Sequence, residues 1–241
     1  MKRLLNLTGI MLMLLLSSLP AFSQDDANAL LVRKCGDFEV TGNGTSPQWQ
    51  GADWMAIPHR AGPRQELATD FKVMHSDSGI YFLFRCQDEK LTATITADFE
   101  DLWHEDVVEV FLWPDQDFPI YFEYELSPLN YELPILVPNL GDELWGWQPW
   151  HYDGARRTRH ATSVQGGDKQ SGASISGWMA EFFIPFELLS PLGNVPPQPG
   201  TRWRANLYRC DYDAGEVDRW EWQPIEKRFH EYQKFGTFVF E

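Results

Sequence analysis

The sequence carries little basic charge. Its 241 residues include 20 Lys and Arg against 35 Asp and Glu, so the formal net charge is −15 at pH 7. Nucleic acids and anionic membranes attract basic surfaces and repel acidic ones. The composition therefore argues against both as partners, while it permits cations and neutral glycans to bind.

Motifs of several enzyme and cofactor classes are missing. The six His residues are scattered without an HExxH pattern, and no CxxCH pattern for covalent haem is present. The sequence also lacks a GxSxG element, a P-loop and a dinucleotide-binding glycine motif. The sequence therefore carries no local signature of a zinc protease, an α/β-hydrolase or a nucleotide-dependent enzyme. A catalytic triad assembled from distant residues stays open.

Long apolar runs are absent except at the amino terminus. Lys2 and Arg3 precede the apolar stretch Leu4–Leu16, and small residues follow it. This arrangement predicts a signal peptide over residues 1–23. A membrane anchor is the competing interpretation, but the stretch is short for one and polar residues interrupt it. We therefore expect residues 24–241 to form an exported, soluble protein, periplasmic or extracellular.

Only three cysteines are present, and their spacing is not typical of a zinc site or a CxxC redox motif. An oxidising compartment permits a disulfide between Cys86 and Cys210, since both end strand-like runs. Buried free thiols are the alternative. No cysteine stands at the predicted cleavage site, so an N-terminal lipid is not expected.

Amphipathic helices, internal repeats and a linker rich in Gly, Ser or Pro are also missing, which favours one domain over residues 24–241. Short β-like runs bounded by turn residues fill the chain instead. They predict an all-β fold, a two-sheet antiparallel β-sandwich of jelly-roll or immunoglobulin-like type. The predicted strands are 68–75, 80–86, 91–96, 106–113, 120–127, 133–137, 175–184, 203–211 and 235–240, with hairpins at 68–86 and 106–127, loops at 142–153 and 156–173, and one helical turn at 186–189.

Three glutamates lie on adjacent predicted strands. Alternation puts Glu123 and Glu125 on one face of their strand, and Glu109 stands on the preceding strand with Asp106 at its start. Carboxylates grouped in this way are typical of calcium ligands or of a glycosidase acid and base. The outward polar face of a half-solvated sheet is the simpler alternative.

The chain has eleven Trp, more than a core of this size commonly needs. Trp103 precedes the strand at 106–113, and Trp222 stands in the segment DRWEWQP, which we expect to be a loop. Three more occur in the central loop at 142–153. Aromatic rings on loops can stack against the apolar face of a sugar, and the alternative is that they plug the ends of the sandwich.

Several segments, in order, resemble carbohydrate-binding module family 9. The segments WQGADWM, IYFLFRCQD and LWHEDVVEVFLWPD resemble its opening half, and YFEYELSPLN resembles the next strand of one subgroup. GWMAEFFIPFELL, PGTRWRANLYRCD, WQP and FHEYQKFGTFVF resemble its second half. The similarity spans about residues 36–241.

This resemblance implies a β-sandwich of the dopamine β-monooxygenase N-terminal superfamily that binds sugar ends between two Trp, and it implies structural calcium. By position, Trp103 and Trp222 resemble the two stacking residues. The resemblance also places polar residues at or near the pocket: Asn206, Arg209, Asp211, Glu109 and Glu123. Family members are commonly attached to a xylanase or another hydrolase, and no catalytic domain is recognisable here.

The leading hypothesis is an exported carbohydrate-binding protein without catalytic residues of its own, which supports polysaccharide breakdown beside cooperating glycoside hydrolases. One alternative is a small glycan-active hydrolase with Glu109 and Glu123 as acid and base. Another is a haem-binding electron-transfer domain of the same superfamily, with axial ligands such as Met74 or Met179. A cell-envelope interaction protein with a decayed sugar site is the fourth. The glycan and the oligomeric state stay open.

Overall fold

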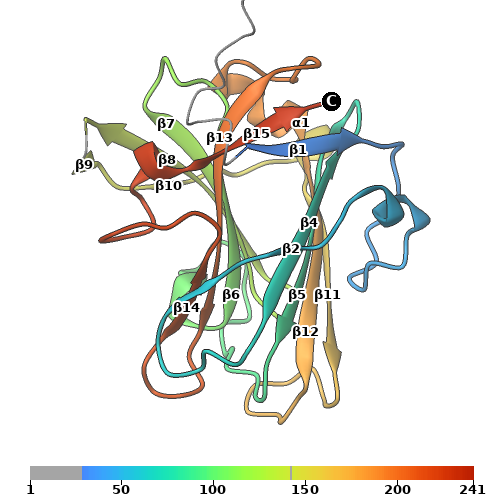
Figure 1. The fold of residues 1–241 in the computed structure, drawn as a ribbon, viewed down its shortest axis with the longest axis vertical. Coiled ribbons are helices and arrows are strands. Elements are labelled where there is room, and N and C mark those ends of the chain that lie inside the picture. Colours follow the sequence, from blue (N-terminus) through green and yellow to red (C-terminus); the bar gives the residue numbers. More distant parts are fainter. Residues whose placement is uncertain (1–28, 142) are drawn as a thin grey trace, which may run out of the picture.

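The computed structural model describes residues 29–141 and 143–241, and the predicted signal peptide over residues 1–23 lies outside the described residues. The strands form two packed layers (Figure 1). Sheet A contains β6 (Val107–Trp113), β7 (Ile120–Leu126), β8 (Glu132–Leu140), β10 (Gln148–Pro149), β13 (Arg202–Asp211) and β15 (Gly236–Phe240), with β14 (Asp218–Glu221) beside β13, β3 (His59–Ala61) beside β14 and β9 (Glu143–Leu144) beside β8.

Sheet B contains β4 (Thr69–His75), β5 (Gly79–Gln87), β12 (Gly177–Pro185) and β11 (Arg159–Gln165), with β2 (Met55–Ala56) beside β4. The first strand, β1 (Ala29–Lys34), pairs in parallel with both β15 and β4 and so joins the two sheets, whereas the other ladders are antiparallel. The all-β, two-sheet sandwich is confirmed, as is the helical turn α1 (Phe186–Leu189). Short 3₁₀ turns cover Pro47–Gly51, Leu102–His104, Gly154–Arg156, Ser190–Leu192 and Tyr232–Lys234.

Side-chain alternation explains the main core. On β6 and β7 every second residue is apolar and points between the sheets, where it joins residues of β4, β5, β12 and β13. The remaining positions of β6 and β7 point to the outer face of sheet A and include Glu109, Glu123 and Glu125. Alternation thus assigned these carboxyls to the correct face. The face is not solvated, however, because residues 229–235 and Trp103 help to cover it.

Four local expectations were wrong. The expected loop at 142–153 contains the two-residue strands β9 and β10, which pair with β8. Residues 156–173 contain the edge strand β11, which pairs along its whole length with β12. Its sequence, RHATSVQ, is polar because an edge strand is only half buried. Residues 91–96 form no strand, because their amide groups donate to carboxylates of Asp106 and Glu105 instead of to a neighbouring strand. The segment DRWEWQP is not all loop, since its first four residues form β14.

All three cysteines are free thiols. Cys86 lies in the core between the sheets, and Cys210 lies on the outer face of sheet A. Because the two side chains lie on opposite sides of sheet A, the disulfide that the sequence permitted is not formed. Within the described residues, no helix combines the length and apolar character needed to cross a bilayer.

Candidate functional site

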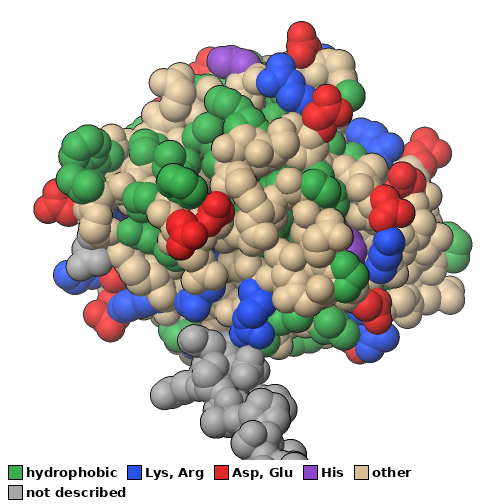
Figure 2. Space-filling view, turned by 90° about the horizontal axis from the view of Figure 1, so that it is seen from above, with side chains coloured by type: hydrophobic (Ala, Val, Ile, Leu, Met, Phe, Trp, Pro, Cys, Tyr) green, Lys and Arg blue, Asp and Glu red, His purple; other side chains and the backbone are tan. Residues whose placement is uncertain are grey.

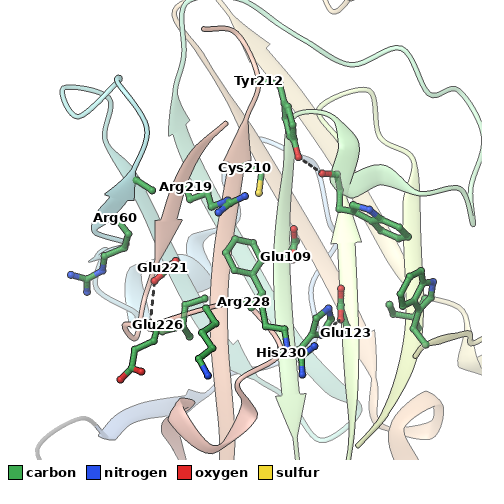
Figure 3. Close-up of a pocket in the computed structure, with 17 residues that line it drawn as sticks. Arg60, Glu109, Glu123, Cys210, Tyr212, Arg219, Glu221, Glu226, Arg228 and His230 are labelled. Atoms are coloured by element: carbon green, nitrogen blue, oxygen red, sulfur yellow. Dashed lines mark hydrogen bonds and ion pairs between the residues drawn. The ribbon is translucent and has the colours of Figure 1, made fainter. Parts of the chain in front are cut away.

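A pocket of about 530 Å³ lies on the outer face of sheet A, between the sheet and the segment at 225–230 (Figure 3). This volume is within the range of ~300–1,000 Å³ that is common for small-molecule sites. Strands β6 and β7 contribute Glu109 and Glu123, β13 contributes Cys210, and β14 contributes Arg219. Strand β3 adds Arg60 and β8 adds Ile135, so residues from six strands and one covering loop meet at a single cavity.

The floor of the pocket carries buried carboxyl groups. Glu109 and Glu123 are 2% and 4% exposed, and Glu125, directly opposite Glu109 on the neighbouring strand, is fully buried. Oε1 of Glu109 and Oε2 of Glu123 have no hydrogen-bond partner among the described residues. Buried polar atoms in native proteins are nearly always paired, with protein, water or ligand. The pocket floor thus offers unused hydrogen-bonding capacity.

Burial also sets the protonation state of these groups. It raises the pKa of Glu109 to about 8, although the nearby Arg219 guanidinium opposes the shift. Burial, together with the charge of Glu109, holds the pKa values of Glu123 and Glu125 well above the usual range of a carboxyl. With a pKa of about 8, Glu109 is mostly protonated at pH 7, and burial likewise disfavours the charged forms of Glu123 and Glu125. A neutral carboxyl both donates and accepts hydrogen bonds, which suits it to the hydroxyl groups of a neutral ligand.

The walls of the pocket are aromatic. Trp103 and Trp147 meet edge to face, with ring centroids 5.2 Å apart and an interplanar angle of 81°. Tyr212 fixes the Trp103 segment, because its hydroxyl donates to the Trp103 carbonyl. Trp147 is 46% exposed, so nearly half of its surface stays available at the mouth of the cavity.

His230 closes the pocket on the side of the covering loop. In Figure 3 its ring lies beside Glu123, and Nδ1 is 3.7 Å from Oε2 of that residue. The same nitrogen hydrogen-bonds with the Tyr121 hydroxyl. Burial, with a smaller effect of Arg228, lowers the pKa of His230 to about 4, so the imidazole is neutral at pH 7. The inner wall is thus uncharged but polar.

Three of the seven sequence-predicted site residues line this pocket: Trp103, Glu109 and Glu123. Trp222 does not, because it is 9% exposed and packs in the core between the sheets. Its ring contacts Phe71 at 5.9 Å and Phe238 at 5.4 Å between centroids. The two Trp that resemble a stacking pair therefore do not face each other across the cavity.

The three residues predicted on β13 also lie outside the pocket lining. Asn206 is buried and donates to the Tyr208 hydroxyl and the Gln223 carbonyl, so it anchors the turn after β14. Arg209 is fully buried, with its guanidinium 3.0 Å from Asp88 and 2.8 Å from Asp211. It also stacks over Trp220 at 4.4 Å. These contacts give Asn206, Arg209 and Asp211 structural partners within the protein.

Several pocket residues were not among the predicted site residues. Trp147 was one of three Trp in a loop without periodicity, and nothing in the sequence separated it from Trp145. Arg219 and His230 belong to a short strand and a covering loop whose positions depend on pairing with β13 and packing on sheet A. The signal that could have helped is the alternation on β13, which places Cys210 on the opposite face of the strand from Arg209.

A second carboxylate cluster lies beside Arg209. Ligand oxygens of Asp88, Asp211 and Asp213 all lie within 4.8 Å of one another, and Oδ2 of Asp213 is buried without a partner. Burial raises the pKa of Asp88 to about 7, partly offset by Arg209. The donor set consists of hard oxygen atoms whose negative charge exceeds that of the one guanidinium beside them. Its chemistry fits the calcium ion that the resemblance implies.

The two methionines considered as haem ligands lie elsewhere. Met74 and Met179 belong to a cluster on the outer face of sheet B, where Met74 is 2% exposed and packs in the same cluster as Trp49 and Tyr81. Neither methionine lines the pocket on sheet A. Their packing accounts for both side chains without an axial ligand role.

Comparisons with known proteins agree with this architecture. Several solved structures share the fold at low sequence identity, whereas a comparison with curated proteins finds no match. A Bacteroides uniformis protein, provisionally described as carbohydrate-binding, superposes with a TM-score of 0.73 at 17% identity, covering 89% of this chain and 99% of that one.

A family 9 carbohydrate-binding module from Caldicellulosiruptor kristjanssonii was solved with cellotriose and with glucose. Its cellotriose complex gives a TM-score of 0.60 at 16% identity over 88% of this chain and 93% of that chain. The glucose complex gives 0.61 at 17% identity, over 88% and 95%. Residues 54–240 of the sequence match the model of the family described as carbohydrate-binding family 9. Because this match spans well over half of the chain, the protein belongs to carbohydrate-binding family 9.

Proposed function

We propose that this protein is an exported carbohydrate-binding protein that holds the end of a glycan in the pocket on sheet A. The observation that carries the proposal is the combination of buried carboxyl groups with unpartnered oxygens on the floor and exposed tryptophan surface at the mouth. The carboxyls suit sugar hydroxyls, and the Trp147 ring suits the C–H face of a pyranose. The sugar complexes of the Caldicellulosiruptor module support the same ligand class.

The pocket favours binding over hydrolysis. A glycosidase needs one protonated carboxyl and one ionised carboxyl. Here burial raises the pKa of Glu109 to about 8 and that of Glu123 well above its usual range, which disfavours the ionised form that a nucleophile or base requires. The protein would therefore act beside glycoside hydrolases that cleave the polysaccharide, and would hold a chain end near them.

Calcium is part of the proposal as a structural ion. Asp88, Asp211 and Asp213 would hold it, and Ca²⁺ would offset the mutual repulsion of these carboxylates. The aspartates sit at the ends of β5 and β13, so the ion would tie sheet B to sheet A. Adding 1 mM Ca²⁺ to the EDTA-treated protein should raise its Tm, whereas equal Mg²⁺ should raise it less, since Mg²⁺ dehydrates reluctantly. An unchanged Tm in Ca²⁺ contradicts this assignment.

Binding is best tested by calorimetry of residues 24–241 against a panel of oligosaccharides. Trp147→Ala should weaken binding at least about tenfold, which corresponds to ~1.4 kcal/mol. Trp145→Ala is the matched control, because Trp145 stands two positions away, is 67% exposed and does not line the pocket. Equal loss in both variants would reject the pocket as the site, and release of shorter sugars would revive the hydrolase hypothesis.

A further inference from the structure

The pocket differs in charge from the protein that contains it. The whole chain has a net charge of −15, yet four of its 20 basic residues line this one cavity: Arg60, Arg219, Lys227 and Arg228. On the end of the sandwich seen in Figure 2, by contrast, acidic and basic side chains are interspersed. A gathering of cations on an acidic protein calls for an explanation.

Partners within the protein do not account for it. Arg60, Arg219 and Lys227 are exposed, and within residues 29–141 and 143–241 their side chains have no hydrogen-bond or ion-pair partner. Figure 3 shows the guanidinium of Arg219 beside Cys210, whereas that of Arg60 lies at the outer rim. Arg219 is therefore the cation placed to meet a ligand that enters the cavity.

The acidic residues of the pocket cancel only part of this charge. Glu226 forms an ion pair with Lys234, with Nζ and Oε1 2.7 Å apart. Glu221 accepts a hydrogen bond from the backbone amide of Ile225 at 3.2 Å, and the charges of Arg60 and Arg219 act on its carboxyl group, so it offsets part of their charge. Burial raises the pKa of Glu109 to about 8 and that of Glu123 well above its usual range, so it disfavours a negative charge on the floor. The cavity thus combines a floor of buried carboxyl groups with a rim on which Arg and Lys outnumber Glu.

Building on the proposed function, we infer that the pocket selects sugars that carry an anionic group, a uronate or a sulfate ester, and that Arg219 binds this group. A guanidinium presents parallel N–H donors that match the two oxygens of a carboxylate or the oxygens of a sulfate. The sugar hydroxyls would meet the carboxyl floor, and the anion would face β14. Arg60 and Lys227 would add long-range attraction at the rim.

The inference is tested with matched pairs of sugars that differ only in the anionic group. Calorimetry would compare glucose with glucuronate, galactose with galacturonate, and galactose with galactose 6-sulfate, together with cello-oligosaccharides and oligogalacturonates. We expect the anionic member of a pair to bind at least about tenfold more tightly, because a charged hydrogen bond is worth more than a neutral one. The advantage should shrink at high salt. The uronate and sulfate arms identify which anion is preferred.

Arg219→Gln should abolish the preference by weakening binding of the anionic sugar at least about tenfold more than binding of its neutral counterpart, since only the anionic sugar makes a charged contact with the guanidinium. Arg33→Gln, at an exposed arginine on β1 outside the pocket, is the control and should keep the preference. Equal affinity for both members of every pair would overturn the inference while leaving the proposed function intact. Binding of no sugar at all would overturn both, and a preference that survives Arg219→Gln would reject the role of Arg219.

Discussion

The outer faces of both sheets bury glutamate side chains, but among the described residues the carboxyl group has hydrogen-bond donors on sheet B, whereas carboxyl oxygens on sheet A lack them. Sheet B buries Glu181 completely, and sheet A buries Glu109, Glu123 and Glu125 almost completely. The Glu181 carboxylate accepts hydrogen bonds from the amides of Thr41, Gly42 and Gly44, at 2.9, 2.7 and 3.3 Å. It also accepts from the Thr41 hydroxyl at 2.9 Å and from Nε1 of Trp49 at 2.7 Å.

No comparable loop serves the carboxyls of sheet A. Its covering segment stands off the floor, and oxygens of Glu109, Glu123 and Glu125 lack partners among the described residues. A buried carboxylate with five donors is a fixed part of the fold, since each unpaired donor would cost free energy. Buried carboxyls without donors reduce stability and are expected where a ligand supplies the missing contacts. Burial alone does not distinguish the two cases, but hydrogen-bond pairing does.

The largest effect is expected when the hydrogen-bonded carboxylate of Glu181 is removed. Glu181→Ala should lower the free energy of unfolding by about 3 kcal/mol or more, because it leaves several buried donors without an acceptor. Urea denaturation with an unchanged m-value would measure the loss. A loss below about 1 kcal/mol would show that the donors find water and that the contrast between the sheets is weaker than described.

Substitution of a glutamate on sheet A should change the free energy of unfolding in the opposite direction and stabilise the protein at high pH. The pKa of Glu109 rises from 4.5 to about 8 on folding, so its contribution to stability is fully present below pH 4.5 and is lost as the pH rises through 8. In the Glu109→Gln variant the side chain at this position does not ionise in either the folded or the unfolded chain. Relative to the unsubstituted protein, the variant should therefore gain about 1–3 kcal/mol between pH 4.5 and pH 8.

Denaturation curves at the two pH values measure this gain. Glu100→Gln serves as the control, because Glu100 is exposed and lies outside the pocket. The same pH dependence in both variants would show that Glu109 is not protonated in the folded protein.

The smallest effect is expected when a single hydrogen bond to Glu181 is removed. Thr41→Ala removes the hydroxyl donor to Glu181 and keeps the backbone amide donor of the same residue. We expect a loss of about 0.5–1.5 kcal/mol, the usual net value of one hydrogen bond. The shift in the thermal midpoint should be a small part of the shift caused by Glu181→Ala. If the two shifts are equal, the hydroxyl rather than the set of amides holds the carboxylate.

The sequence predicted the layers better than the site. Period-two alternation placed Glu123 and Glu125 on the same face correctly, because strand geometry leaves two choices. It could not show that Arg209 turns inward to Asp88, since charged residues are rarely expected between sheets. Trp222 was assigned from its place in the WQP turn, and its contact with Phe238 depends on how β14 packs. The covering loop with His230 has no periodicity, so its position follows from tertiary packing alone.

The parallel pairing of β1 with both sheets also affects how chains of this protein meet one another. Strands β10 and β11 end the continuous path of paired strands within the described residues. Unpaired strand edges invite addition of a second chain, and proteins protect them with short strands, proline and charge. β10 is two residues long and contains Pro149. β11 is longer but polar, so resistance to edge-to-edge aggregation depends mainly on the side chains of that strand.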